Sequence, residues 1–155
     1  MTVEQLKRYG LEVMHDQEIV AFLNNQSIGV LGLSGRERPY LVPLSYAHDD
    51  GTLYFTYLLG SESRKEELSE RAGGGQFLVY TSNSMFQWQS VLLDGELRKI
   101  PASEWDELSD VLTDVWRPKL FETATSSRNV SIYAFDVVEQ IGLRHTGLAP
   151  GMARR

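Results

Sequence analysis

The fold is decided by one stretch of the chain, RPYLVPLSYAHDDGTLYFTYLLGSESRKEEL, residues 38–68. Two β-rich runs, 38–47 and 52–58, flank a turn that ends in Asp50-Gly51. An Asp-Gly pair between alternating apolar residues is typical of a β-hairpin. The second run gives way to Gly and Ser residues and then to a helical segment, so the stretch predicts strand, turn, strand and helix in succession.

The helix at the end of this stretch begins with a capping box. Ser63 is followed three residues later by Glu66, which predicts a helix over residues 63 to about 71. Two cations, Arg64 and Lys65, stand in its first turn, where the helix dipole is already positive. Either they belong to a solvated helix start, or they bind an anion such as a phosphate monoester together with the free N–H groups.

Alternating apolar and polar residues predict strands on both sides of this stretch, at residues 27–34, 76–82, 86–100 and 130–142. Gly95 is expected to mark a bulge or bend. Helices are expected only at 17–25, at 63–71 and between Pro101 and Pro118, and Gly73-Gly74-Gly75 is interpreted as a linker. A doubly wound sheet needs helices that alternate regularly with strands, so the pattern instead predicts a mainly β protein, a small closed antiparallel barrel with peripheral helices.

Length and composition place limits on the class of protein. At 155 residues we expect a single domain, 1–155, with a core of about 16–141, an N-terminal lead 1–15 and a peripheral tail 142–155. A net charge of −6 disfavours nucleic acid as a partner. The chain has no cysteine, and its N-terminus has no apolar run that could serve as a signal or cross a membrane. A cytoplasmic location without membrane contact is therefore expected.

The histidines carry no recognisable chemistry. His15, His48 and His145 are expected before the first helix, in a hairpin turn and in the tail. None has a metal-ligand neighbour at helical spacing or a GxSxG-type nucleophile beside it. His48-Asp49-Asp50 is interpreted as a solvated turn in preference to a weak cation site. The sequence predicts no metal site and no catalytic side chain.

Residues 38–68, together with MFQWQSVLLDGEL at 85–97, resemble the FMN-binding split β-barrel family related to pyridoxamine 5′-phosphate oxidase. The shared order is PYxVPxSY, a turn, LYF, a short Gly/Ser link, RK and L, followed by W-x-S-V and G-x-L. The resemblance covers residues 16 to 140 in element order. It implies a six-stranded antiparallel split barrel and a homodimer that holds two FMN molecules in clefts at the subunit interface.

The resemblance also implies which positions hold the cofactor. The isoalloxazine ring would lie against Val42, Pro43, Leu44 and Ser45, with the wall continued by Tyr54, Phe55, Thr56 and Tyr57; the phosphate would be bound by Ser63, Arg64 and Lys65, and the partner subunit would supply Trp88, Gln89 and Ser90.

Two departures from the family pattern stand out. Many relatives have a His where this chain has Thr56, and the tail, GLRHTGLAPGMARR, lacks the C-terminal basic motif with which true pyridoxamine 5′-phosphate oxidases hold the substrate phosphate. Arg144-His145 matches that motif only in part. The resemblance therefore implies a chemistry other than the oxidation of pyridoxamine 5′-phosphate.

The leading hypothesis is an FMN-dependent oxidoreductase that acts on an unidentified small molecule, with NAD(P)H as electron donor by analogy to the family. Two alternatives keep the same barrel: a reductase that uses the deazaflavin F420, and a non-catalytic module that carries flavin or haem or has lost its ligand. Flavin, deazaflavin and haem absorb visible light differently, so the spectrum of the purified protein separates these alternatives.

Overall fold

The computed structural model describes residues 2–58, 64–113 and 130–147, with side chains for all of them except residues 58, 64, 65, 112 and 113. The strands are β1 Leu11–Met14, β2 Ile28–Leu33, β3 Tyr40–Asp49, β4 Thr52–Leu58, β5 Gly74–Ser84, β6 Gln87–Ile100 and β7 Val130–Thr146. The helices are α1 Val3–Arg8, α2 Asp16–Asn25, α3 Arg64–Ala72, the 3-10 helix η1 Ala102–Leu108 and α4 Ser109–Thr113.

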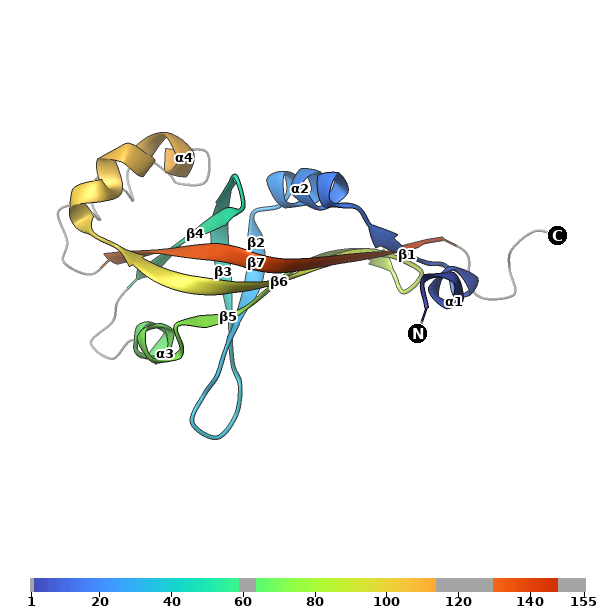
Figure 1. Cartoon of the computed structure of the whole chain (residues 1–155), viewed down its shortest axis with the longest axis horizontal. Coiled ribbons are helices and arrows are strands. Elements are labelled where there is room, and N and C mark those ends of the chain that lie inside the picture. The colour runs from blue at the N-terminus through green and yellow to red at the C-terminus, as the bar shows by residue number, and fades with distance from the viewer. Residues whose placement is uncertain (1, 59–63, 114–129, 148–155) are drawn as a thin grey trace.

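Six of the strands form a closed antiparallel barrel, in the order β7-β4-β3-β2-β5-β6, and the pairing of β6 with β7 closes it. The seventh strand, β1, pairs with the far end of β7. In Figure 1, β6 and β7 run on past the barrel toward β1 and α1 and form an arm beside it. The predicted fold class, a six-stranded antiparallel split barrel, is confirmed.

Alternation along the strands fills the barrel with aromatic rings. Phe55, Phe77 and Phe135 meet at centroid distances of 4.8, 5.9 and 6.4 Å, and all three are fully buried. The predicted bulge is confirmed at Gly95, where the pairing of β6 with β7 shifts register. A Cβ at residue 95 would lie 2.5 Å from the Phe135 ring, so only glycine fits there.

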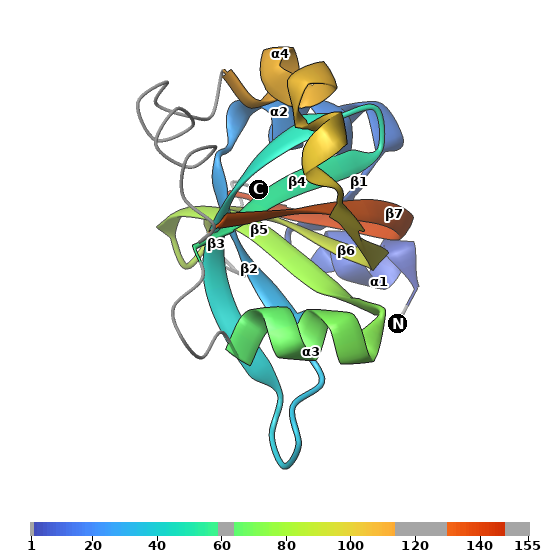
Figure 2. The same ribbon diagram turned by 90° about the vertical axis from the view of Figure 1, so that its left-hand side faces the viewer.

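The helices cover the barrel from different sides. Figure 2 shows α3 and α4 on opposite sides of it. The α2 helix buries Ile19, Phe22 and Leu23, and the hydroxyl of Tyr46 donates a hydrogen bond to the carbonyl of Leu23 at 2.7 Å. Trp105, Leu108 and Val111, from η1 and α4, pack on a second small core on the outside of the barrel, made of Ala47, Ile100, Ile132 and Ala134.

The structure corrects several expectations. Of the three glycines that the sequence predicted as a linker, only Gly73 lies between elements, with φ +64, because Gly74 and Gly75 begin β5. A Cβ at residue 75 would lie 2.6 Å from the carbonyl oxygen of Gly32, so the close packing of β5 on β2 requires this glycine. The helix after Pro101 is mostly a 3-10 helix, and its expected end at Pro118 lies outside the described residues.

The N-terminal segment also differs from expectation. We expected neither α1 nor β1, and β7 continues four residues beyond the expected end at residue 142 because it pairs with β1. His145 is consequently a buried strand residue and not part of a tail. His48 lies within β3, where its Nδ1 is 2.8 Å from Asn24 Oδ1, and not in the turn.

Candidate functional site

The barrel is split between β3 and β4. The two strands pair only through residues 46–49 of β3 and 52–55 of β4. Residues 40–45, which precede this ladder in β3, pair with β2, and residues 56–58, which follow it in β4, pair with β7. The facing edges of residues 40–45 and 56–58 therefore have backbone groups without a strand partner in the described ladders, and such groups can bind a ligand.

Side chains at the split alternate between core and surface. Leu44, Phe55 and Tyr57 are buried inside the barrel, and Val42 packs against the same core. On the outer wall, Pro43 and Ser45 are exposed, whereas Tyr54 and Thr56 are partly buried. A ligand on the outer wall can thus meet side chains from the second set, while the inner residues could contribute only backbone atoms.

Thr56 has an unusual side chain. Its Oγ1 is buried and has no hydrogen-bond partner within the described part of the chain. A buried hydroxyl without a partner costs about 1–3 kcal/mol. Thr56 is the first residue of β4 beyond the pairing with β3, so this hydroxyl is available at the start of the split.

The α3 helix follows the split and covers one end of the barrel. Both acidic residues of its first turn are paired: Glu66 with Lys99 at 2.9 Å, and Glu67 with Arg36 at 3.2 Å and with Arg71 at 3.8 Å. In the sequence Glu62, Glu66 and Glu67 nearly balance Arg64 and Lys65. In the structure Glu66 pairs with a cation from β6, and Glu67 pairs with one from the β2–β3 loop and one from later in α3. The predicted capping residue Ser63 and the side chains of Arg64 and Lys65 lie outside what the structure describes.

The hydrogen bond from Lys99 lowers the pKa of Glu66, and Ser131 and Tyr133 add to the effect. Glu66 is therefore ionised at neutral pH.

Trp88, Gln89 and Ser90 form a separate group near the start of β6. Trp88 and Ser90 are half-buried and share the outer side of the strand with exposed Leu92, whereas Gln89 points to the opposite side. This group pairs with residues 143–145 of β7, whereas β4 pairs with residues 130–136 of the same strand, so one chain holds the group away from the split.

Arg144 and His145, which match the C-terminal basic motif only in part, make contacts within the fold. Arg144 forms ion pairs with Glu12 at 3.1 Å and with Glu18, and the bond to Glu12 raises the pKa of Arg144. His145 is buried beside Phe86 and Trp88, at ring distances of 5.7 and 6.2 Å. Its Nδ1 lies 3.4 Å from the backbone N–H of Gly147, which donates to it.

Comparison with known families agrees with this architecture. A family model described as pyridoxamine 5′-phosphate oxidase matches residues 15–144. The chain belongs to this family. No curated protein sequence matches the chain at a significant level.

Solved structures of other proteins share the barrel of this pyridoxamine 5′-phosphate oxidase family member. An FAD-binding protein from Mesorhizobium loti is 18% identical, with 86% of this chain and 97% of that chain covered and a TM-score of 0.69. An FAD- and haem-binding protein from Mycobacterium smegmatis is 15% identical, with coverages of 90% and 75% and a TM-score of 0.68. A conserved hypothetical protein from Mycobacterium tuberculosis is 17% identical, with coverages of 91% and 94% and a TM-score of 0.70. At these identities the likeness shows the fold alone.

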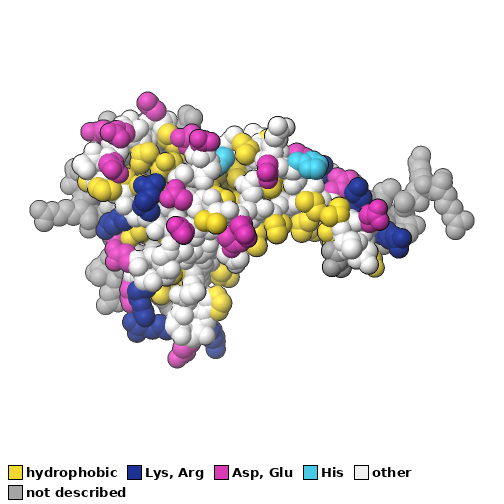
Figure 3. Space-filling model, viewed as in Figure 1, with side chains coloured by type: hydrophobic (Ala, Val, Ile, Leu, Met, Phe, Trp, Pro, Cys, Tyr) yellow, Lys and Arg dark blue, Asp and Glu magenta, His cyan; other side chains and the backbone are white. Residues whose placement is uncertain are grey.

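This family member leaves a large apolar surface uncovered, which we call the apolar face. Its central row crosses four strands through the register partners Val30, Leu78, Leu92 and Ile141. Around this row, the same side of the sheet carries exposed Ile28, Leu41, Tyr80 and Val13. Figure 3 shows hydrophobic side chains gathered along the underside of the arm. Contiguous apolar patches of this kind mark interaction surfaces.

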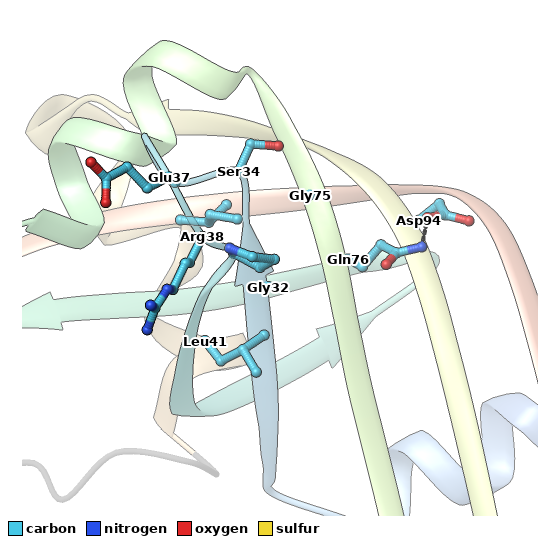
Figure 4. A pocket seen from close by; sticks show the side chains of 11 residues that line it. Gly32, Ser34, Glu37, Arg38, Leu41, Gly75, Gln76 and Asp94 are labelled. Atoms are coloured by element: carbon cyan, nitrogen blue, oxygen red, sulfur yellow. Dashed lines mark hydrogen bonds between the residues drawn. The ribbon is translucent and has the colours of Figure 1, made fainter.

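A polar groove of ≈ 640 Å³ borders the apolar face, and the sequence did not predict it. It lies where Gly32, which has no side chain, stands between its register partners Leu41 and Gln76. Figure 4 shows the groove beneath the β2–β3 loop, with Gln76 donating a hydrogen bond to Asp94 at 2.8 Å. Gly32, inside the β-rich run 27–34, was the only sequence signal for it.

Two further features concern metals and membranes. Within residues 2–58, 64–113 and 130–147, no three acidic or histidine side chains come together as metal ligands would. No helix in that same part of the chain combines the length and hydropathy of a membrane span.

Proposed function

We propose that this chain is a flavin-dependent oxidoreductase that holds FMN at the interface of a homodimer and acts on a small molecule other than pyridoxamine 5′-phosphate. One observation carries the proposal. The buried Oγ1 of Thr56 has no partner among the described residues, and it lies where β3 and β4 part. A ligand in the split would supply that partner, and membership of the family makes a flavin the ligand of choice.

The chain's residues fit an FMN molecule placed along the outer wall. Pro43 and Ser45 would lie against the ring, and Thr56 would exchange a hydrogen bond with it or with its ribityl chain. The start of α3 would hold the phosphate with its free N–H groups and with Arg64 and Lys65. When bound, FMN supplies the two-electron chemistry, so the protein needs to provide only binding, orientation and exclusion of water.

One feature supports FMN over other cofactors. A single phosphate monoester suits a single helix start whose acidic residues are paired elsewhere. Two structural relatives carry FAD in their names, so FAD is the nearest alternative within the flavins, and F420 or haem would change the cofactor on the same barrel.

A second copy of the chain would complete the site. The apolar face offers a surface that a partner would cover, and the group at Trp88 lies away from the split of its own chain. In a homodimer, Trp88 of the partner subunit and Ser90 of the partner subunit would reach the flavin. The polar groove begins at Leu41, one residue before the predicted ring wall, and offers room for a small-molecule substrate.

Oxidation of pyridoxamine 5′-phosphate is disfavoured because Arg144 is held by Glu12 and Glu18. We propose NAD(P)H as electron donor by analogy to the family alone.

The visible spectrum of the purified protein tests the proposal, and it is recorded before and after addition of FMN. We expect the absorption of an oxidised flavin, a phosphorylated flavin released on denaturation, and bleaching on anaerobic addition of NADPH or NADH. A protein that stays colourless after incubation with FMN would refute the proposal. A deazaflavin spectrum would instead identify F420 as the cofactor, and a Soret band would identify haem.

A further inference from the structure

Glu66 connects the first turn of α3 to the barrel through one oxygen atom. Its Oε1 accepts hydrogen bonds from Lys99 Nζ at 2.9 Å, Ser131 Oγ at 3.1 Å and Tyr133 OH at 3.5 Å. The donors come from β6 and β7, far from α3 in the sequence. Charge-assisted bonds to a carboxylate are stronger than neutral ones, so this cluster holds the start of α3 firmly against the barrel.

The same helix is anchored one turn later. Leu68 and Ser69 are buried, and Ser69 Oγ lies 2.8 Å from Tyr57 OH. The Tyr57 ring stacks on the Tyr133 ring at a centroid distance of 4.5 Å. Two stacked tyrosines thus contact α3 at Glu66 and at Ser69, and together they fix the direction of the helix relative to β4.

This anchoring introduces an electrostatic conflict. A carboxylate in the first turn of α3 repels a phosphate bound at the same helix start, because like charges a few ångströms apart interact strongly near a protein surface. The conflict is specific to Glu66, because Glu67 is balanced by two arginines. Lys99 is the one cation that pairs with Glu66 in the described part of the chain, and its side chain is half exposed.

We propose that the Glu66–Lys99 ion pair determines the preference of this site for a phosphorylated over an unphosphorylated flavin. Glu66 is a positioning residue that sets the first turn of α3 by accepting three hydrogen bonds. Lys99 cancels the charge of that acceptor, so that the helix start keeps a positive potential. The inference rests on the proposed function, because it assumes that the phosphate binds at the start of α3.

The test measures dissociation constants of FMN and riboflavin, which differ by the phosphate, using quenching of flavin fluorescence. We expect Lys99→Met to weaken FMN binding about tenfold, as expected for an uncompensated charge beside a helix start, and riboflavin binding less than twofold. The double variant Lys99→Met, Glu66→Gln is expected to recover FMN affinity to within about threefold of the original protein, since glutamine keeps an acceptor oxygen without the charge. High salt should shrink the deficit of Lys99→Met, because salt screens charges.

The matched control is Arg98→Met. It removes a cation from the neighbouring position of β6, where Arg98 pairs with Asp136 at 3.2 Å on the outside of the barrel. The FMN-to-riboflavin ratio should stay unchanged there. Glu66→Ala removes the acceptor as well as the charge, and its FMN affinity should fall and not be restored by Lys99→Met.

The outcomes separate the two proposals. Equal loss of FMN and riboflavin affinity in Lys99→Met, or a double variant that stays as weak as Lys99→Met, would make the pair merely structural and overturn the inference, while FMN binding by the original protein would stand. If the original protein binds neither flavin, or binds both equally well, no phosphate site exists at α3, and the inference fails together with that part of the proposed function.

Discussion

Replacing Thr56 with valine should change stability and flavin binding in opposite directions. Valine has nearly the shape of threonine but no hydroxyl, and in this structure that hydroxyl is buried without a partner. Removing it spares the folded, ligand-free protein a desolvation cost of about 1–3 kcal/mol. Allowing for local relaxation, we expect the free energy of unfolding to rise by about 1 kcal/mol. In a domain of this size that corresponds to an increase of about 2–4 °C in Tm.

The same substitution removes a hydrogen bond from the flavin complex. A net contribution of about 0.5–1.5 kcal/mol per hydrogen bond predicts FMN binding about twofold to twelvefold weaker. Thermal unfolding of the flavin-free protein measures the first effect, and titration of flavin fluorescence measures the second. An increase in Tm together with a loss of affinity is the signature of a hydroxyl reserved for a ligand.

Thr52 provides the matched control on the same strand. Its Oγ1 donates a hydrogen bond to Asp136 Oδ1 at 3.0 Å, so its hydroxyl is already paired. Thr52→Val should lower the free energy of unfolding by about 1 kcal/mol and leave FMN affinity unchanged. If Thr56→Val destabilises the flavin-free protein as Thr52→Val does, or binds FMN as tightly as the original protein, the Thr56 hydroxyl has no role at the flavin.

Three further predictions concern the dimer, the barrel and alkaline pH. Ile141→Asp puts a charge at a 61% exposed position on the apolar face and should give a monomer in light scattering. The control variant Val20→Asp, at an exposed position of α2, should stay dimeric. A dimeric Ile141→Asp protein would exclude the apolar face as the interface. Gly95→Ala should lower the free energy of unfolding by about 2 kcal/mol in denaturant titration, because its Cβ would lie 2.5 Å from the Phe135 ring, and an unchanged midpoint would contradict the packing. Burial raises the pKa of Tyr57 from 10.0 to about 12, so the unfolded chain loses this proton first. The contribution of Tyr57 to stability should therefore decline by up to about 3 kcal/mol between pH 10 and 12, and Tyr57→Phe should remove that part of the alkaline loss of stability.

The barrel was predictable because its signals are local. Alternation in residues 38–58 and the Asp50-Gly51 turn are properties of neighbouring residues, and the Gly95 bulge follows from a glycine inside an alternating strand. β1 has no such signal, since its four residues become a strand only by pairing with β7, more than a hundred residues away. The extra length of β7 follows from the same long-range contact.

The site was predictable only in part. The sequence identified the β3–β4 and α3 segments, but it assigned Val42, Leu44, Phe55 and Tyr57 to the ring without separating inner from outer positions. The structure distinguishes the two sets, because these four side chains lie inside the barrel or pack against its core. The unpaired hydroxyl of Thr56 also depends on every neighbour in space, so no local pattern could reveal it. Whether the predicted residues bind FMN stays a prediction.

Charge at α3 shows why counting residues in a segment misleads. In the sequence, Glu62, Glu66 and Glu67 nearly cancel Arg64 and Lys65, which favours an ordinary solvated helix start. In the structure, Lys99 and Arg36 come from β6 and from the β2–β3 loop to pair with Glu66 and Glu67. Folding thus places part of the compensation of the acidic residues on other elements, so the charge around the helix start depends on the barrel as well as on the helix. For this reason the sequence left the two interpretations of Arg64 and Lys65 open, and anion binding at the start of α3 stays a prediction.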